Sequence, residues 1–266
     1  MTWSKKESLV LAAILLATTI AYANSLKNPF ITDDRYIILK NFSPWQSWTL
    51  GDLFTRSLFS TSPSESSYFR PLTLLTFALN YPLAGANPWG YRAVNIGIHL
   101  LVIVLIYLLA SQLAGRWVAI FSALLYALHP VHVQAASYIS SRSDLLYTAL
   151  ALSSLLFWHK GSHAQGTKRP IYLNSALSAF FFGLFAKENI VVVPALAVVM
   201  DLVWNHAGSW RDKIKENFGW YLGFIFLFAI YLIVRLGAGF PLSMEGGREF
   251  AFSLRILFAL KLFALY

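Results

Sequence analysis

Residues Ala93–Leu113 read AVNIGIHLLVIVLIYLLASQL and contain no Asp, Glu, Lys or Arg. A helix of about 20 predominantly apolar residues is long enough to cross the hydrocarbon core of a bilayer. This stretch meets both conditions. The sequence therefore predicts a membrane-spanning helix at this position.

Seven further stretches have the same apolar character, and each is bounded by charge, Gly or Pro. They are Ser8–Ala23, Trp117–Ala135, Leu145–His159, Ile171–Ala186, Ile190–Trp204, Trp220–Leu236 and Phe250–Tyr266. We interpret the first as a retained anchor, because many spans follow a run that carries no convincing cleavage site. The sequence thus predicts an all-α polytopic membrane protein with seven or eight transmembrane helices.

The composition agrees with this class. Of the 266 residues, 57% are hydrophobic and 12% are charged, against about 45–50% and about 25% in soluble domains. Such hydrophobicity excludes intrinsic disorder. The chain has no cysteine, which excludes a disulfide scaffold, a thiolate zinc site and a cysteine nucleophile. The net charge of +9 is attributed to membrane topology, with attraction to anionic headgroups, and not to nucleic-acid binding.

The basic residues indicate an orientation. Cytoplasmic loops carry an excess of Lys and Arg, and placing the N-terminus in the cytoplasm gives that excess. The basic residues then assigned to the cytoplasm are Lys5, Lys6, Arg116, Lys160, Lys168, Arg169, Arg211, Lys213 and Lys215. The short outer loops contain Arg142, Lys187 and Arg248.

The longest region outside the predicted spans is the first outer loop, residues 24–92. Within it, Pro71–Ala84 is about 14 residues long and is interrupted by Pro82. That length favours an interfacial or re-entrant segment over a span. Counting this segment as a span would also reverse the charge bias of every later loop.

Polar clusters gather on the predicted outer side: Asp33-Asp34-Arg35 in the first loop, then His129 with His132, Arg142–Asp144 and Lys187–Asn189. Ionisable residues near a membrane interior are costly and mark function. The aspartates are interpreted as a carboxylate base with an orienting or metal-binding neighbour, the alternative being a solvated helix cap or a local ion pair.

The other clusters also leave alternatives open. His129 and His132 have the i, i+3 spacing of a metal-binding face, but Pro130 breaks the helix there, so a hydrogen-bonding role at a helix end is favoured. Arg142 is either an interfacial charge or, with Lys187, a clamp for phosphate. Lys187 and Glu188 are alternatively a snorkelling pair. The chain contains neither a P-loop nor a GxGxxG motif, which favours a lipid-carried donor over a nucleotide.

Four ordered blocks resemble one family. They are FITDDRYIILKN (Phe30–Asn41), YFRPLTLLTFALNYPLAGANPWGYRAVNIGIHLL (Tyr68–Leu101), ALHPVHVQAASYISSRSDLL (Ala127–Leu146) and FAKENIVVVPALAVVMDL (Phe185–Leu202). The chain is similar to the transmembrane and tetratricopeptide-repeat-containing protein O-mannosyltransferases and their bacterial relatives, in the C-type glycosyltransferase superfamily. The resemblance implies a helical bundle of that superfamily, with juxtamembrane helices in the first outer loop.

The resemblance also implies an activity. A sugar of the mannose type would pass from a polyprenyl-phosphate donor to an acceptor hydroxyl, on protein or glycan, at the outer face with inversion. Asp34, or else Asp33, would be the general base, and Arg142 and Lys187 would hold the lipid phosphate. We expect the substrate-binding set to include Glu188, Arg70, His129 and His132 as well. No cofactor is firmly implied, and a divalent cation is left open.

Family members continue with more membrane helices and a repeat array, whereas no period of about 34 residues occurs here. We therefore expect a single transmembrane domain over residues 1–266, truncated at its C-terminus. The alternatives are an inactive truncated homologue, or a transporter or flippase, which the absence of an inverted repeat disfavours. The absence of cysteine and sorting motifs favours a bacterial inner membrane over an endoplasmic reticulum.

Overall fold

The computed structural model describes residues 5–42, 49, 51–58, 68–204 and 209–240. Within these ranges every regular element is a helix, and no strand occurs. The predicted all-α class is therefore confirmed. The expected span Phe250–Tyr266 lies outside the described residues.

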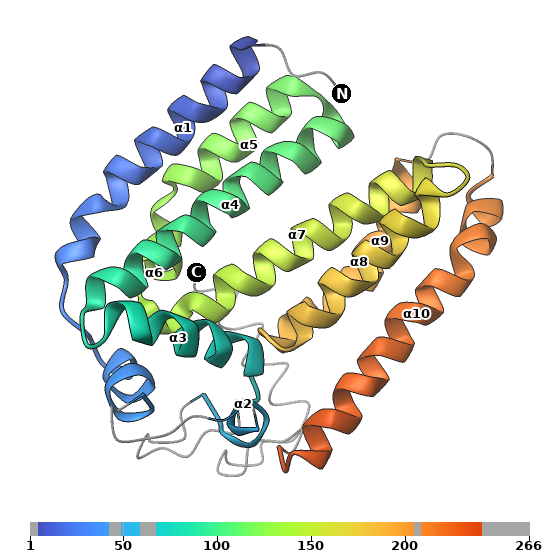
Figure 1. The fold of residues 1–266 in the computed structure, drawn as a ribbon. Helices are drawn as coiled ribbons and strands as arrows, with labels where there is room; N and C mark the ends of the chain where they lie inside the picture. Colours follow the sequence, from blue (N-terminus) through green and yellow to red (C-terminus); the bar gives the residue numbers. More distant parts are fainter. Residues whose placement is uncertain (1–4, 43–48, 50, 59–67, 205–208, 241–266) are drawn as a thin grey trace, which may run out of the picture.

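The long helices form two groups that share a boundary (Figure 1). In the first group, α1 (Lys5–Ala23) and α5 (Arg116–Leu128) pack against α4 (Pro88–Ala114). Asn87 caps α4 by accepting a hydrogen bond from the backbone N–H of Trp89 at 3.1 Å. The proline that follows Asn87 suits the first helical position because no backbone N–H is needed there.

The second group contains α7 (Arg142–His163), α8 (Lys168–Leu184), α9 (Val193–Val203) and α10 (Trp210–Gly237). Helix α7 packs against α4 and so joins the two groups. The core between α7, α8 and α10 contains the fully buried rings of Trp158, Phe180 and Phe224. The Phe224 ring lies 5.4 Å from that of Trp158 and 5.0 Å from that of Phe180.

Short helices connect the long ones at one end of the molecule, which we call the lower end after its place in Figure 1. The lower end also contains the first residues of α4 and α7. The short helices are η1 (Asn24–Lys27), the π-helix η2 (Arg35–Lys40), α2 (Asp52–Thr55), α3 (Pro71–Ala84), η3 (Pro130–His132), α6 (Val133–Ser137), η4 (Ile139–Ser141) and η5 (Glu188–Val192). The upper end contains the last residues of α4 and α7 and the first residues of α5 and α8.

Among the described residues, three helices are long and apolar enough to cross a membrane: Lys5–Lys27, Pro88–Ala114 and Trp210–Gly237. A fourth is added if α5 and Pro130–Ser137 count as one broken span. The expected single span Trp117–Ala135 is bent by 53° at this break, because the helix cannot run through Pro130 without losing a hydrogen bond. The total of seven or eight spans stays a prediction.

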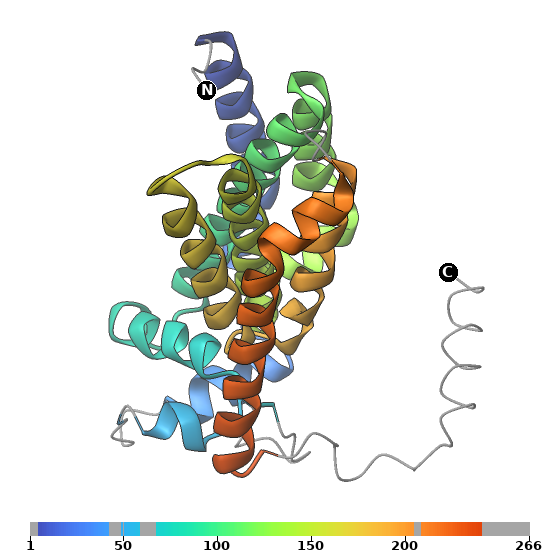
Figure 2. The ribbon, with the colours of Figure 1, turned by 90° about the vertical axis from the view of Figure 1, so that its right-hand side faces the viewer.

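Helix α3 has the bounds Pro71–Ala84, as the sequence indicated for the interfacial segment. It begins with proline at its first position and ends before Gly85, whose φ of 53° and ψ of −130° form a backbone conformation that glycine adopts readily. Figure 2 shows α3 extending sideways across the lower end. Buried residues of α3, among them Leu74 and Phe77, pack with Ile37 and Ile38 of η2. This packing fixes the first loop against α3.

The charged clusters separate as the sequence predicted. The residues assigned to cytoplasmic loops lie at the upper end, and Asp33, Asp34, Arg142 and Lys187 lie at the lower end. Which end faces the cytoplasm stays a prediction.

The contact between α3 and α4 can be tested at Gly90. A Cβ placed on Gly90 would lie 2.6 Å from the Cβ of Ala84, so the backbone of one helix must move. We expect Gly90→Ala to lower the free energy of unfolding by about 1–3 kcal/mol, measured by thermal unfolding in detergent. Gly97→Ala on the same helix is the matched control, because no described atom outside its own stretch of helix backbone lies within 4 Å of its Cβ position. A loss of equal size in both variants would contradict the assigned contact.

Candidate functional site

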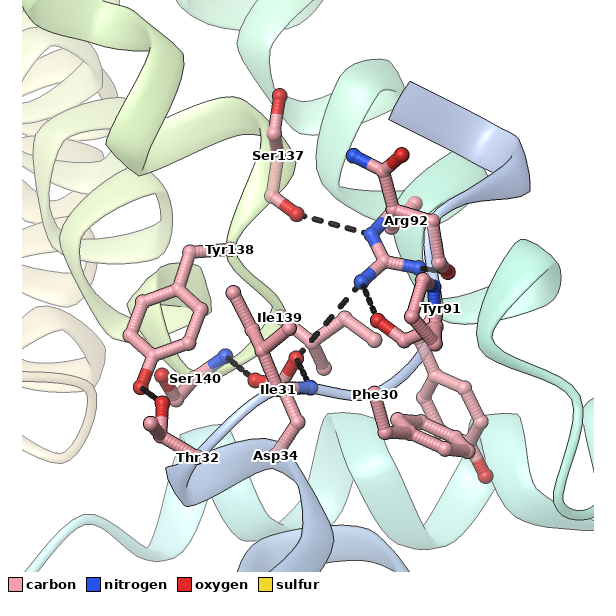
Figure 3. Close-up of polar contacts among 12 residues, drawn as sticks. Phe30, Ile31, Thr32, Asp34, Tyr91, Arg92, Ser137, Tyr138, Ile139 and Ser140 are labelled. Carbon is pink, nitrogen blue, oxygen red and sulfur yellow. Dashed lines mark hydrogen bonds and ion pairs between the residues drawn. The ribbon is translucent and has the colours of Figure 1, made fainter. Parts of the chain in front are cut away.

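The loop that follows α1 places the two aspartates at the lower end. Thr32, just before them, has a φ of 35°, a left-handed conformation that threonine rarely adopts. Its hydroxyl is hydrogen-bonded at 2.6 Å to the hydroxyl of Tyr138 (Figure 3). The backbone N–H of Asp34 donates to the carbonyl of Ile31 at 2.9 Å. The loop is thus held in a strained turn next to the segment that precedes α7.

Asp34 is fully buried. One carboxylate oxygen accepts a hydrogen bond from the backbone N–H of Ser140 at 3.0 Å, and the other accepts one from Ile31 at 3.4 Å. Arg92 Nη2 lies 3.8 Å from Asp34 Oδ2 (Figure 3). Burial raises the pKa of Asp34 to about 6, a shift that the two hydrogen bonds and Arg92 partly oppose and that Asp33 reinforces.

Arg92 fastens the first loop to the chain around it. Its guanidinium donates to the backbone carbonyls of Asn28, Pro29 and Ser137, with distances of 2.7 Å to Pro29 and 3.0 Å to Ser137. Arg92 is 1% exposed. A planar fork with five N–H donors is suited to hold several carbonyls at once. Arg92 and Asp34 together therefore determine where the loop lies.

Arg142 begins α7 and is fully buried. Its Nε donates to Asn95 Oδ1 at 2.8 Å, and its Nη2 donates to Asn80 Oδ1 at 3.0 Å. Carbonyls of Thr76 and Tyr91 accept two more hydrogen bonds, at 3.3 and 2.9 Å. The guanidinium carbon also lies 4.2 Å from the centre of the Phe77 ring. Arg142 thus joins α7 to α3 and α4 through hydrogen bonds.

Arg70 and Lys187 meet the next two residues of α7. Arg70 Nη1 donates to Ser143 Oγ at 3.1 Å, and Lys187 forms an ion pair with Asp144. Arg70 is 8% exposed, and its buried Nε has no hydrogen-bond partner in the described part of the chain. Backbone N–H and hydroxyl groups of α3 donate to the carbonyls of Phe185 and Ala186. These bonds bring the Arg70 and Lys187 segments together.

Four of the eight predicted site residues therefore converge on Ser140–Asp144, which we call the junction segment. Asp34 contacts Ser140, Arg142 belongs to the segment, and Arg70 and Lys187 contact its last two residues. Asp33 is half-buried beside Asp34, and no hydrogen bond or ion pair to it occurs within the described residues. Glu188 is half-buried next to Lys187. The arrangement places carboxylates and cations at one end of the molecule.

The histidine pair belongs to a different cluster. His129 Nδ1 accepts a hydrogen bond from the backbone N–H of Val131 at 3.2 Å, the helix-end role that the sequence favoured. The His132 ring lies 3.9 Å from that of Tyr126 and 6.1 Å from that of His99. Neither histidine contacts the junction segment through a hydrogen bond in the described ranges. Over the same residues, no group of three His, Cys, Asp or Glu could hold a metal ion.

Sequence reasoning did not single out Arg92, Asn80 or Asn95. All three are buried, and Asn95 is fully so. A signal for them existed, because amide and guanidinium side chains within apolar helices are costly and need partners. Their partners lie up to 64 residues away along the chain, as Asn28 does from Arg92, and such pairings are not visible in the sequence.

The fold and this cluster together define a helical membrane protein with a charged site at one end. A family model described as dolichyl-phosphate-mannose-protein mannosyltransferase matches residues 69–234. The chain belongs to this family. No solved structure matches it.

Curated relatives give the same result. The chain is 35% identical to human protein O-mannosyl-transferase TMTC2 over 204 residues, which cover 73% of this chain and 24% of the relative. It is 33% identical to human TMTC1 over 207 residues, which cover 72% of this chain and 23% of the relative. It is 30% identical to human TMTC4 over 273 residues, which cover 89% of this chain and 35% of the relative. The chain thus spans about a quarter to a third of the length of these relatives.

The role of Arg142 in joining helices can be tested with Arg142→Lys. A single ammonium group cannot replace the fork, so the oxygens of Asn80 and Asn95 lose their donor. We expect a loss of about 2–5 kcal/mol in the free energy of unfolding, measured by thermal unfolding in detergent. Arg116→Lys, at an exposed position on α5, is the control and should be nearly neutral. An unchanged melting temperature for Arg142→Lys would contradict this role.

Proposed function

We propose that this chain is a membrane glycosyltransferase that moves a mannose-like sugar from a polyprenyl-phosphate donor to an acceptor hydroxyl. The observation that carries the proposal is the convergence of Asp34, Arg70 and Lys187 on the junction segment, with Asp33 adjacent to Asp34, in a chain of the mannosyltransferase family. A lipid-linked donor suits a site at the end of membrane helices. The names of the relatives support a protein acceptor, and we place the lower end on the outer face of a bacterial inner membrane.

The reaction is a single displacement at the anomeric carbon. The acceptor oxygen forms a bond to that carbon while the bond from the carbon to the phosphate oxygen breaks. The electron pair of the broken bond leaves with the polyprenyl phosphate, and the proton of the acceptor hydroxyl passes to a carboxylate. The configuration at the anomeric carbon is inverted. Such a site needs a base near the acceptor and positive charge near the leaving phosphate.

The environments of the two aspartates favour Asp33 as the base. A base must come within hydrogen-bond reach of the acceptor hydroxyl. Asp34 is fully buried, and both of its oxygens already accept backbone hydrogen bonds. Asp33 is half-buried, and its carboxylate accepts no such hydrogen bond from the described residues. We therefore revise the preference for Asp34 and propose that Asp34 positions the loop that carries Asp33.

The basic side chains of the site also have two proposed roles, one in positioning and one in binding the phosphate. Arg142 already uses four of its N–H groups on neutral protein oxygens, so we propose that it positions the start of α7. Arg70 Nε has no hydrogen-bond partner among the residues that the structure describes, and the Lys187 side chain is 19% exposed. These two side chains are the proposed phosphate ligands. Glu188 stays a predicted substrate contact, and so do the two histidines, although their cluster lies apart.

Asp33→Asn and Asp34→Asn separate the two roles. We expect Asp33→Asn to lower the transfer rate by about 10²–10⁴-fold with an unchanged melting temperature, because it removes only the proton acceptor. Asp34→Asn should lower the rate and change the melting temperature together, because its oxygens hold the loop. The assay follows transfer of labelled mannose from polyprenyl-phosphate mannose to a serine- and threonine-containing peptide in membranes.

Asp52→Asn is the matched control, because Asp52 belongs to α2 and pairs with Arg56. It should leave transfer nearly unchanged. If Asp33→Asn transfers at the wild-type rate while Asp34→Asn is inactive with a normal melting temperature, Asp34 is the base. If both variants transfer at the wild-type rate, the proposed function is wrong.

The buried carboxyl also predicts a dependence of stability on pH. Because the pKa of Asp34 is raised to about 6 in the folded chain, the folded state binds its proton more tightly than the unfolded state. Its contribution therefore stabilises the fold at low pH and is lost as the pH rises through about 6. We expect the melting temperature of the wild type to rise relative to that of Asp34→Asn when the pH falls from about 7.5 to about 5. A difference that stays constant, or that changes in the opposite direction, would contradict the assignment.

A further inference from the structure

The upper end contains a cavity that the proposed reaction does not use. Its volume is about 520 Å³, and it lies between the end of α4, the end of α7 and the start of α8. The proposed catalytic residues lie at the opposite end of α7 (Figure 1). The polar lining residues are Gln112, His159, Lys160, His163 and Tyr172.

The lining is suited to an anion. Lys160 supplies a positive charge, and no carboxylate lines the cavity within the described part of the chain. The rings of His159 and His163 lie 4.4 Å apart, and His163 Nδ1 lies 2.8 Å from the carbonyl oxygen of His159. The lysine ammonium group and the tyrosine hydroxyl supply hydrogen-bond donors. Such donors are suited to phosphate oxygens.

The lining is also partly apolar. Leu108 and Ala164 contribute to the wall, and Ile171 beside Tyr172 is 62% exposed. A free anion gains nothing from apolar surface, whereas an amphiphile buries its first methylene groups against it. The cavity therefore presents the two kinds of surface that a phospholipid headgroup and the start of its acyl chains require.

Hydrogen bonds hold the walls in place. Ser154 of α7 donates to the carbonyl of Ala176 in α8 at 2.8 Å. Asn217 of α10 donates to Asp201 at 2.6 Å and to Ser162 at 3.3 Å, so α7, α9 and α10 are joined as well. The indole N–H of Trp204 donates to the carbonyl of Leu113 at 2.9 Å and joins the end of α9 to the end of α4. The cavity is thus formed by helices that are fixed relative to one another.

Basic residues outnumber acidic ones where α8 and α10 begin. Lys168 and Arg169 begin α8, and Arg211, Lys213 and Lys215 lie in the first turns of α10 together with Asp212 and Glu216. Arg169 and Lys213 form ion pairs with Glu216 at 2.9 and 3.0 Å. The sequence assigns these residues to the cytoplasmic side, where anionic lipids attract basic side chains.

We propose that the cavity binds the phosphate headgroup of one anionic phospholipid, with Lys160 and Tyr172 as donors to the phosphate. This inference does not rest on the proposed glycosyl transfer. It assigns a lipid site to the upper end, separate from the donor lipid that the lower end would use.

Native mass spectrometry of the full chain in detergent tests the proposal. With added phosphatidylglycerol, we expect the wild type to retain one lipid, and with phosphatidylcholine none. Lys160→Gln should weaken retention about fivefold, since a cation near anionic lipid contributes about 1 kcal/mol. Tyr172→Phe, which removes only the hydroxyl, should weaken it as well. Lys168→Gln is the matched control, because Lys168 is exposed at the same end but does not line the cavity.

Three outcomes would overturn the proposal. Equal retention of phosphatidylcholine would show that the headgroup charge is not recognised. Equal losses in Lys168→Gln and Lys160→Gln would indicate diffuse attraction to the basic end. Displacement of the lipid by millimolar inorganic phosphate would assign the cavity to free phosphate. Melting temperatures of the variants establish that each is folded, and the result is independent of transfer activity.

Discussion

The burial of the Arg142 guanidinium is the constraint on which the lower end depends. A buried charge is tolerated only when its hydrogen-bonding groups are satisfied. Here the acceptors are two asparagine side chains and two carbonyls, all neutral, and they come from α3 and α4. The three helices must therefore keep one relative position. That position determines where Ser143 and Asp144 lie, and through them where Arg70 and Lys187 lie.

Burial also distinguishes two adjacent aspartates that are chemically identical. One is enclosed by backbone N–H groups and the fork of Arg92, and the other lies partly open to the surroundings. Neighbouring carboxyl groups in different environments take different roles. The strained turn at Thr32 has a place in this arrangement. Local strain persists where the surrounding structure determines the conformation, and here the hydroxyl of Tyr138 and the anchored Asp34 do so.

Much of this architecture was visible in the sequence. The bounds Pro71–Ala84 of α3 were visible as a short apolar segment, and the gathering of charge at two ends followed from loop parity. The orientation of the junction segment did not, because consecutive helical residues point in directions about 100° apart. Arg142 therefore faces α3 and α4 while its neighbours face Arg70 and Lys187. Helix α10 begins at Trp210 and not at Trp220, since its first turns are charged and escape a search for apolar residues.

The junction segment has a consequence for how this protein varies. Four separated parts of the chain contact the same five consecutive residues: Asp34, residues 70–80, residues 91–95 and Lys187. Substitutions there share partners, and their energies are not additive. A substitution that is harmful alone is then tolerated only when a second residue that contacts the segment is also substituted. In related proteins, the order in which these substitutions occur therefore matters. The lower end is therefore expected to diverge in correlated sets, while exposed faces of the bundle drift one residue at a time.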